Sequence, residues 1–322
     1  MKNITITYPN FSQKAISFTL DDGNLEWDKV VIDIMRPHGV IGTFNLNLPK
    51  YDQLSKEGYR ELYSGYGIAN HCAKHPYAFL DGVDYKVTDE PFDKEKGNPE
   101  LIYKSPDDDR LYYIMKTRGW RLITTPEHYI ELVEEAQAVL EELFGVKIKG
   151  FVWPFGEQSS EVVQEYLKGR FESVRRTGAI LNKDGFDAPQ DFFGWSYNAT
   201  HANLLEVAEM YEAEPENGNL KLFTFGVHSV DYPRAGKLDT LKEFAEKYGD
   251  RKAEFWYATI DDIFDYLKAS RAILITDDYI VNTSDEVIYL KRTDNGQRII
   301  LPAGEKITCE NEEKYYVLDA EI

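Results

Sequence analysis

The stretch SFTLDDGN, from Ser17 to Asn24, joins a strand pattern to two adjacent carboxylates and a glycine. The apolar run from Ala15 to Leu20 is rich in β-branched and aromatic residues, which predicts a buried strand. Neighbouring strand residues point to opposite sides, so we expect Asp21 and Asp22 to face different partners. Two like charges side by side at a strand end are costly, which indicates that they share a cation.

Strand patterns and helix patterns alternate along most of the chain after this stretch. Residues 39–46, 146–156 and 221–229 have strand character, and residues 125–145 form a helix pattern that Thr125 caps and Gly145 ends. A second capped, amphipathic helix is expected over residues 259–270. The alternation predicts right-handed crossovers and a mainly parallel sheet, open or closed into a barrel. In such folds the chemistry lies at the carboxyl ends of the strands, where Asp21 and Asp22 fall.

Two regions interrupt the alternation. The segment near residues 77–119 is polar, charged and proline-bearing, which predicts an insertion. Residues 271–322 contain only strand and turn signals, including a DNG turn typical of a hairpin. We therefore expect an α/β domain over residues 1–270 and a small β-rich extension over residues 271–322.

Charge and composition exclude several classes of partner. The 322 residues include 37 basic and 56 acidic ones, for a net charge of −19. This balance argues against nucleic acid and anionic membranes as partners, and it favours neutral or cationic substrates over polyanions. No apolar run is long enough for a membrane span, the first residues lack a signal-peptide pattern, and two cysteines give no disulfide framework. Together these features predict a cytoplasmic protein, with a trimmed secreted form left open.

The histidines of GIANHCAKH supply a candidate counter-charge for the two aspartates. His71 and His75 are four residues apart, which on a helical turn would place both imidazoles on one face. One carboxylate and two imidazoles are the three-ligand set typical of a catalytic metal site with an open position for water. Such a set suits Zn²⁺ first, and also Co²⁺, Ni²⁺ or Fe²⁺.

Several motifs together resemble those of the polysaccharide deacetylases, carbohydrate esterase family 4. SFTLDDG is similar to the family's first motif, T-F-D-D-G, and HCAKH matches its second, H-x-x-x-H. VWPFG stands where the third motif, R-P-P-Y-G, is expected, and FGVHS stands where a late strand carries a histidine. The resemblance covers roughly residues 15–267. It implies a distorted (β/α) barrel of the polysaccharide deacetylase type, followed here by a C-terminal β-rich appendage.

The resemblance also implies a role for each motif residue. Asp22, His71 and His75 correspond to the metal ligands, Asp21 to the general base, and His228 to the acid that protonates the leaving group. The implied activity is hydrolysis of an acyl group, N-acetyl before others, from an acylated sugar or oligosaccharide.

Further roles follow from the later motifs. Asp191 is the expected residue that orients the catalytic histidine, with Asp187 nearly as good. The resemblance points to the backbone N–H of Phe155 as a donor to the tetrahedral oxyanion. Trp153, Phe155 and Trp195 are candidates for contacts with the sugar, because aromatic faces stack on sugar rings.

The chain departs from the family pattern in two places. Val152 stands where the third motif has an arginine that steadies the catalytic aspartate, so either Asp21 has a higher pKa than usual or a cation such as Arg175 or Arg176 substitutes. Gly194 replaces the inner aspartate of the fourth motif. Two alternatives therefore stay open: a deformylase or amidase acting on a soluble, non-polymeric substrate, and a carbohydrate-binding protein with a decayed active site.

Overall fold

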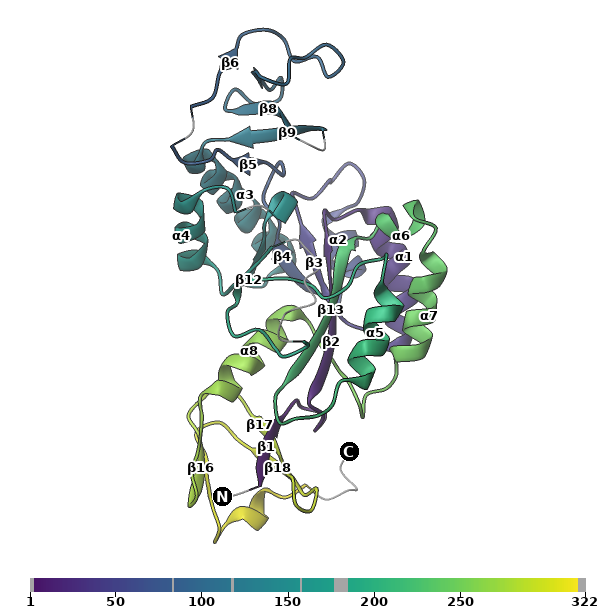
Figure 1. Cartoon of the computed structure of the whole chain (residues 1–322), viewed down its shortest axis with the longest axis vertical. Helices are drawn as coiled ribbons and strands as arrows, with labels where there is room; N and C mark the ends of the chain where they lie inside the picture. The colour runs from purple at the N-terminus through teal and green to yellow at the C-terminus, as the bar shows by residue number, and fades with distance from the viewer. Residues whose placement is uncertain (1–2, 83, 117–118, 157, 177–184, 318–322) are drawn as a thin grey trace.

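A curled parallel sheet forms the centre of the computed structural model, which describes residues 3–82, 84–116, 119–156, 158–176 and 185–317. The strand order is β12-β11-β10-β4-β3-β2-β13, with β14 paired to β2, and the sheet curls into a half-barrel (Figure 1). Its strands are β2 (Lys14–Asp21), β3 (Thr43–Leu46), β4 (Gly67–Asn70), β10 (Gly150–Val152), β11 (Ser173–Arg175), β12 (Phe193–Trp195), β13 (Lys221–His228) and β14 (Trp256–Tyr257). The parallel, barrel-like sheet predicted from the alternating patterns is confirmed.

Helices cover the outer side of this sheet (Figure 1). They are α1 (Leu25–Met35), α2 (Lys56–Leu62), α3 (Pro126–Phe144), α4 (Glu161–Arg170), α5 (Leu204–Ala213), α6 (Asp231–Arg234), α7 (Leu238–Tyr248) and α8 (Ile260–Arg271), with single 3₁₀ turns η1 (Arg36–His38), η2 (Pro154–Gly156) and η3 (Glu312–Tyr315). The predicted ends of α3 are confirmed, because the Thr125 side chain accepts from the His128 amide and Gly145 ends the helix with φ 68°.

Strand β2 shows how the sequence positions the candidate site. Ile16, Phe18 and Leu20 are fully buried and belong to the apolar core that the helices cover. The alternate side chains are polar and also buried, and the last of them is Asp21. Because residues two apart in a strand lie on one face, the apolar face anchors the strand while the polar face delivers Asp21 to the inner side of the sheet.

The insertion expected near residues 77–119 contains a separate five-stranded sheet at one end of the molecule (Figure 1). Its order is β5-β9-β8-β7-β6, and its last strand runs beyond the expected boundary. The strands are β5 (Tyr77–Ala78), β6 (Val87–Thr88), β7 (Ile102–Lys104), β8 (Leu111–Lys116) and β9 (Gly119–Thr124).

Two small antiparallel sheets lie at the opposite end (Figure 1). One contains β1 (Ile4–Thr7), β17 (Ile288–Arg292) and β18 (Arg298–Leu301), and the other contains β15 (Ile273–Ile275), β16 (Tyr279–Asn282) and β19 (Lys306–Thr308). The expected hairpin at DNG joins β17 to β18. Because β1 pairs with β17, residues from the start of the chain share a sheet with the C-terminal strands, and the division at residue 270 stays a proposal. Among the described residues, no helix has the length and apolar character that a membrane crossing needs.

Candidate active site

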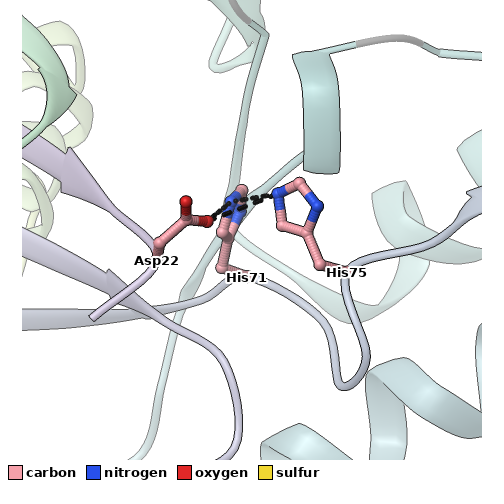
Figure 2. Close-up of side chains that lie close together, drawn as sticks. All are labelled: Asp22, His71 and His75. Carbon is pink, nitrogen blue, oxygen red and sulfur yellow. Dashed lines mark hydrogen bonds and ion pairs between the residues drawn. The ribbon is translucent and has the colours of Figure 1, made fainter. Parts of the chain in front are cut away.

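Asp22, His71 and His75 converge at the carboxyl end of the curled sheet (Figure 2). The Nε2 atoms of His71 and His75 lie 3.3 and 3.4 Å from the same oxygen, Oδ1 of Asp22. The two Nε2 atoms are 3.1 Å apart. The three side chains come from the turn after β2 and the loop after β4, and they offer ligand atoms within 4.8 Å of one another. This is the spacing that a single cation requires of its ligands.

The loop from His71 to His75 is not the helical turn that the spacing of four residues predicted. It is an irregular loop in which Cys72, Lys74 and His75 have left-handed φ angles of 62°, 62° and 52°. Such angles are uncommon for residues with a side chain and cost free energy, and they are concentrated at functional sites. The imidazoles therefore meet because the backbone folds back on itself. The cysteine between them is buried, and burial raises the pKa of its thiol well above the usual value, consistent with a packed residue.

The turn after β2 explains the glycine of the DDG motif. Asp22 has φ 78° and Gly23 has φ 61°, so two consecutive residues are left-handed. A Cβ atom at position 23 would lie 2.9 Å from Cδ2 of Leu46. Glycine suits position 23 because it adopts a left-handed φ without strain, whereas a Cβ atom there would also press on the end of the Leu46 side chain.

The hydrogen bonds of His71 prepare its Nε2 atom as a ligand. Its Nδ1 lies 2.9 Å from the carbonyl oxygen of Val152, which can only accept, so Nδ1 carries the proton and Nε2 keeps its lone pair. Burial, and then the neighbouring His71 ring, lower the pKa of His75 to about 4. His75 is therefore neutral at neutral pH. A carboxylate and two imidazole nitrogens fit a divalent transition metal.

Asp21 occupies a different environment from its neighbour, as the strand alternation predicted. It is 3 % exposed and pairs with the guanidinium of Arg175, which is itself fully buried. Asn45, directly across from Asp21 on β3, donates to its Oδ1 from 2.7 Å. Burial alone would raise the pKa of Asp21, but Arg175 and the nearby His71 and His228 outweigh it and lower that pKa.

Arg175 resolves the departure at Val152. In the parallel pairing of β10 with β11, Arg175 lies directly opposite Val152. Its guanidinium lies over the ring of Tyr197, with Cζ 5.2 Å from the ring centroid. An arginine one strand away at the same height therefore reaches Asp21, and of the substitutes expected from the sequence it is Arg175 that makes this contact.

His228 lies on the other side of Asp21, opposite it in the pairing of β13 with β2. Its Nε2 is 3.5 Å from Oδ2 of Asp22, the oxygen that does not face the other two histidines. Its Nδ1 is 2.8 Å from Oδ2 of Asp231, in the first turn of α6. Burial lowers the pKa of His228, but Asp22, Asp21 and Asp231 outweigh it and raise that pKa above its usual value.

The expectation that Asp191 orients His228 is contradicted, because Asp231 holds that position. The carboxylate of Asp191 accepts from the Phe193 amide at 2.8 Å and lines a cavity of about 490 Å³. The available signal was the spacing of three residues between His228 and Asp231. Asn45 was also missed, and only its place opposite Asp21 on the next strand identifies it.

The aromatic candidates separate into two groups. Trp153 is 1 % exposed and Trp195 is 7 % exposed, so both indoles are packed in the protein, and Trp195 also borders the cavity that Asp191 lines. Phe155 is half-buried, and its ring centroid lies 4.4 Å from that of His75. Its backbone is left-handed, with φ 58°, like the His75 loop that it contacts. Of the three, only Phe155 lies beside the candidate ligands.

The chain is similar to known proteins both in sequence and in structure. Residues 9–173, just over half of the chain, match the model of a family described as polysaccharide deacetylase. No curated protein matches the sequence. Peptidoglycan deacetylase PdaC from Bacillus subtilis is 14 % identical, with TM-score 0.46 over 81 % of this chain and 94 % of that one. A family 4 acetyl xylan esterase from Clostridium thermocellum, in complex with a cobalt ion, is 15 % identical, with TM-score 0.43 over 78 % and 90 % of the two chains.

Proposed function

The chain belongs to the polysaccharide deacetylase family, and we propose that it is a metal-dependent hydrolase that removes an N-acetyl group from a carbohydrate. One observation carries the proposal. Two adjacent aspartates end β2, and one of them converges with two histidines while the other is held between a buried arginine and an asparagine. A metal site beside a separately positioned carboxylate is the arrangement that hydrolysis of an amide needs.

Asp22, His71 and His75 are the residues that would hold the metal. Their donor atoms fit Zn²⁺ best, and Co²⁺, Ni²⁺ or Fe²⁺ next. A bound ion of this kind would polarise the acyl carbonyl and increase the acidity of the attacking water. The carbonyl of Val152 supports this role by fixing the tautomer of His71.

Asp21 and His228 divide the proton transfers between them. Asp21 accepts a proton from the water as its oxygen bonds to the acyl carbon, and the lowered pKa keeps this carboxylate ionised and ready. The carboxylates of Asp22, Asp21 and Asp231 raise the pKa of His228, which favours its protonated ring. With Nδ1 donating to Asp231, Nε2–H can protonate the amine nitrogen as the carbon–nitrogen bond breaks, which releases acetate and the free amino sugar.

Phe155 is the proposed donor to the oxyanion. Its ring contacts His75, which places this residue beside the proposed ligands. A backbone N–H aimed at the developing negative charge stabilises the transition state more than the substrate.

The alternative of a decayed site loses part of its support. It rested on Val152 and on the weak fourth motif, but Arg175 supplies a cation to Asp21 from the neighbouring strand. A deformylase or amidase acting on a small soluble substrate would use the same residues, and only the choice of substrate separates it from our proposal.

Acetate release tests the proposal. The purified protein, loaded with Zn²⁺ or Co²⁺, is expected to release acetate from N-acetylated chitooligosaccharides, and Asp21→Asn is expected to abolish the release. Asp191→Asn is the matched control and is expected to retain the activity, because Asp191 contacts neither the metal ligands nor His228. A metal-loaded protein that releases no acyl group from any acylated sugar or amide would contradict the proposal.

A further inference from the structure

One face of the insertion's sheet contacts Phe155, the residue beside the proposed metal ligands. Tyr112 and Ile114 on β8 lie opposite Ile123 and Arg121 on β9. Because side chains two apart in a strand share a face, these four residues lie on one side of the sheet. Phe155 from the half-barrel packs on the apolar cluster of this side. Phe155 therefore contacts both a proposed metal ligand and the sheet of the insertion.

The ring of Phe155 contacts both an imidazole and a guanidinium. His75 approaches it with ring centroids 4.4 Å apart, and Tyr77 stacks on it at 4.5 Å. Cζ of Arg121 lies 4.7 Å from the centroid of the same ring. The insertion thus brings a permanent positive charge to the aromatic ring that contacts a proposed metal ligand.

Arg121 has donors to spare at this position. A guanidinium has five N–H donors, and within the described residues Arg121 uses them for one bond only, from Nη1 to the carbonyl oxygen of Trp120 at 3.2 Å. It forms no ion pair with any described carboxylate, whereas Arg110 in the same insertion pairs with Glu131. In a chain with 56 acidic residues against 37 basic ones, a half-buried arginine without an acidic partner is the less expected state.

We propose that Arg121 and Phe155 form a subsite for a carboxylate on the substrate, carried by the sugar ring next to the acylated amine. This inference rests on the proposed function and names a substrate class for it, an acidic amino-sugar oligosaccharide. The planar guanidinium binds a carboxylate through two parallel hydrogen bonds, and the ring of Phe155, over which the guanidinium lies, holds it beside the proposed metal ligands. The net charge of −19 repels such a substrate at long range, but salt screens that repulsion, and the local cation offsets it on contact.

Two disaccharides test the subsite. One is N,N′-diacetylchitobiose, which is neutral, and the other joins N-acetylglucosamine to glucuronic acid. We expect the metal-loaded protein to prefer the acidic substrate in kcat/KM. In Arg121→Gln that preference falls by about tenfold to a hundredfold, because turnover of the acidic substrate falls by more than turnover of the neutral one. Arg121→Lys keeps the charge and is expected to retain part of the preference, and the matched control Arg110→Gln retains all of it.

Binding provides a readout that does not depend on turnover. Calorimetry with the acidic disaccharide is expected to give a weaker Kd for Arg121→Gln than for the wild type, with or without activity. N-Acetylglucosamine 6-phosphate replaces the carboxylate by a phosphate, and an equal effect of Arg121→Gln on its binding would show that the subsite takes either anion. Equal Kd values for the wild type and Arg121→Gln, or no binding by either, would overturn the inference. Acetate release that shows no preference lost in Arg121→Gln would also overturn it, while leaving the proposed function intact.

Discussion

In chain order, the strands of the curled sheet fall into a first half (β2 to β4) and a second half (β10 to β13), and these supply the candidate site in different ways. On β2 and β4, the proposed metal ligands stand where short motifs predict them, with Asp22 directly after one strand and His71 directly after the other. On β10 to β13, the supporting charges come from positions that the motifs do not mark, namely Arg175 and Asp231. The first half keeps residues in a fixed local order, because a metal requires its ligands close together. The supporting residues of the second half only need to bring a charge beside the site, and residues on several strands can do this.

The largest expected effect lies in the first half. Asp22→Ala removes the carboxylate that both imidazoles face, and we expect loss of bound metal and a fall in kcat/KM of about 10³-fold or more. Metal content of the purified variant, measured by elemental analysis, checks the ligand role directly. Asp33→Ala is the matched control, because Asp33 is an exposed aspartate paired with Lys29. An Asp22→Ala protein with full metal content would show that Asp22 is not a metal ligand.

The next prediction concerns Arg175, the residue of the second half that supplies the positive charge expected at Val152. Arg175→Met leaves Asp21 buried without its cation, which is expected to lower the free energy of unfolding by about 3–5 kcal/mol. Asp21→Asn combined with Arg175→Met removes both charges and is expected to recover much of that loss. Urea denaturation of metal-free protein measures both variants.

A surface pair provides the control for this comparison. Arg170 bonds Glu134 on partly exposed helix surfaces, so Arg170→Met is expected to cost less than about 1 kcal/mol. If Arg175→Met were no less stable than Arg170→Met, the buried pair would not replace the arginine that is missing at Val152.

A smaller effect is expected at Asp231, the other supporting charge of the second half. Asp231 orients His228 and raises its pKa, so Asp231→Asn is expected to lower kcat/KM by about tenfold to a hundredfold, less than loss of a whole general acid. Because the proposed role of His228 requires a protonated ring, activity is expected to fall as pH rises through its pKa. Without Asp231 that pKa is lower, so the alkaline limb of the pH profile moves to lower pH. Asp191→Asn is expected to leave the limb in place, and a limb that moves in neither variant would separate His228 from the proton transfer.

The sequence predicted the sheet, its crossing helices and the three residues that converge, because each depends on local periodicity or on a short motif. It did not predict the conformation of the His71–His75 loop, since a spacing of four residues suits a helical turn as well as a left-handed loop. Nor could it choose Arg175 from the available cations, because that choice depends on the register between β10 and β11. Registers join segments that are distant in sequence, and no short pattern encodes them.

The last comparison concerns a buried carboxyl group in the first half. Asp28, in α1, is fully buried and accepts a hydrogen bond from the Tyr63 hydroxyl at 2.7 Å. Burial raises the pKa of this carboxyl from 3.8 to about 7. Between these two values the folded protein holds a proton that the unfolded chain has released. The contribution of Asp28 to stability is therefore fully present below pH 3.8 and is lost as pH rises through about 7.

Asp28→Asn removes this titration, so the wild type should lose stability relative to the variant as pH rises across that window. The expected slope of the difference is at most about 1.4 kcal/mol per pH unit. Urea denaturation of the metal-free proteins at a series of pH values measures it, with Asp33→Asn as an exposed control. If the difference between the wild type and Asp28→Asn stayed constant with pH, Asp28 would be ionised in the fold. The first half would then contain, besides Asp21, a second buried carboxylate that is ionised in the fold.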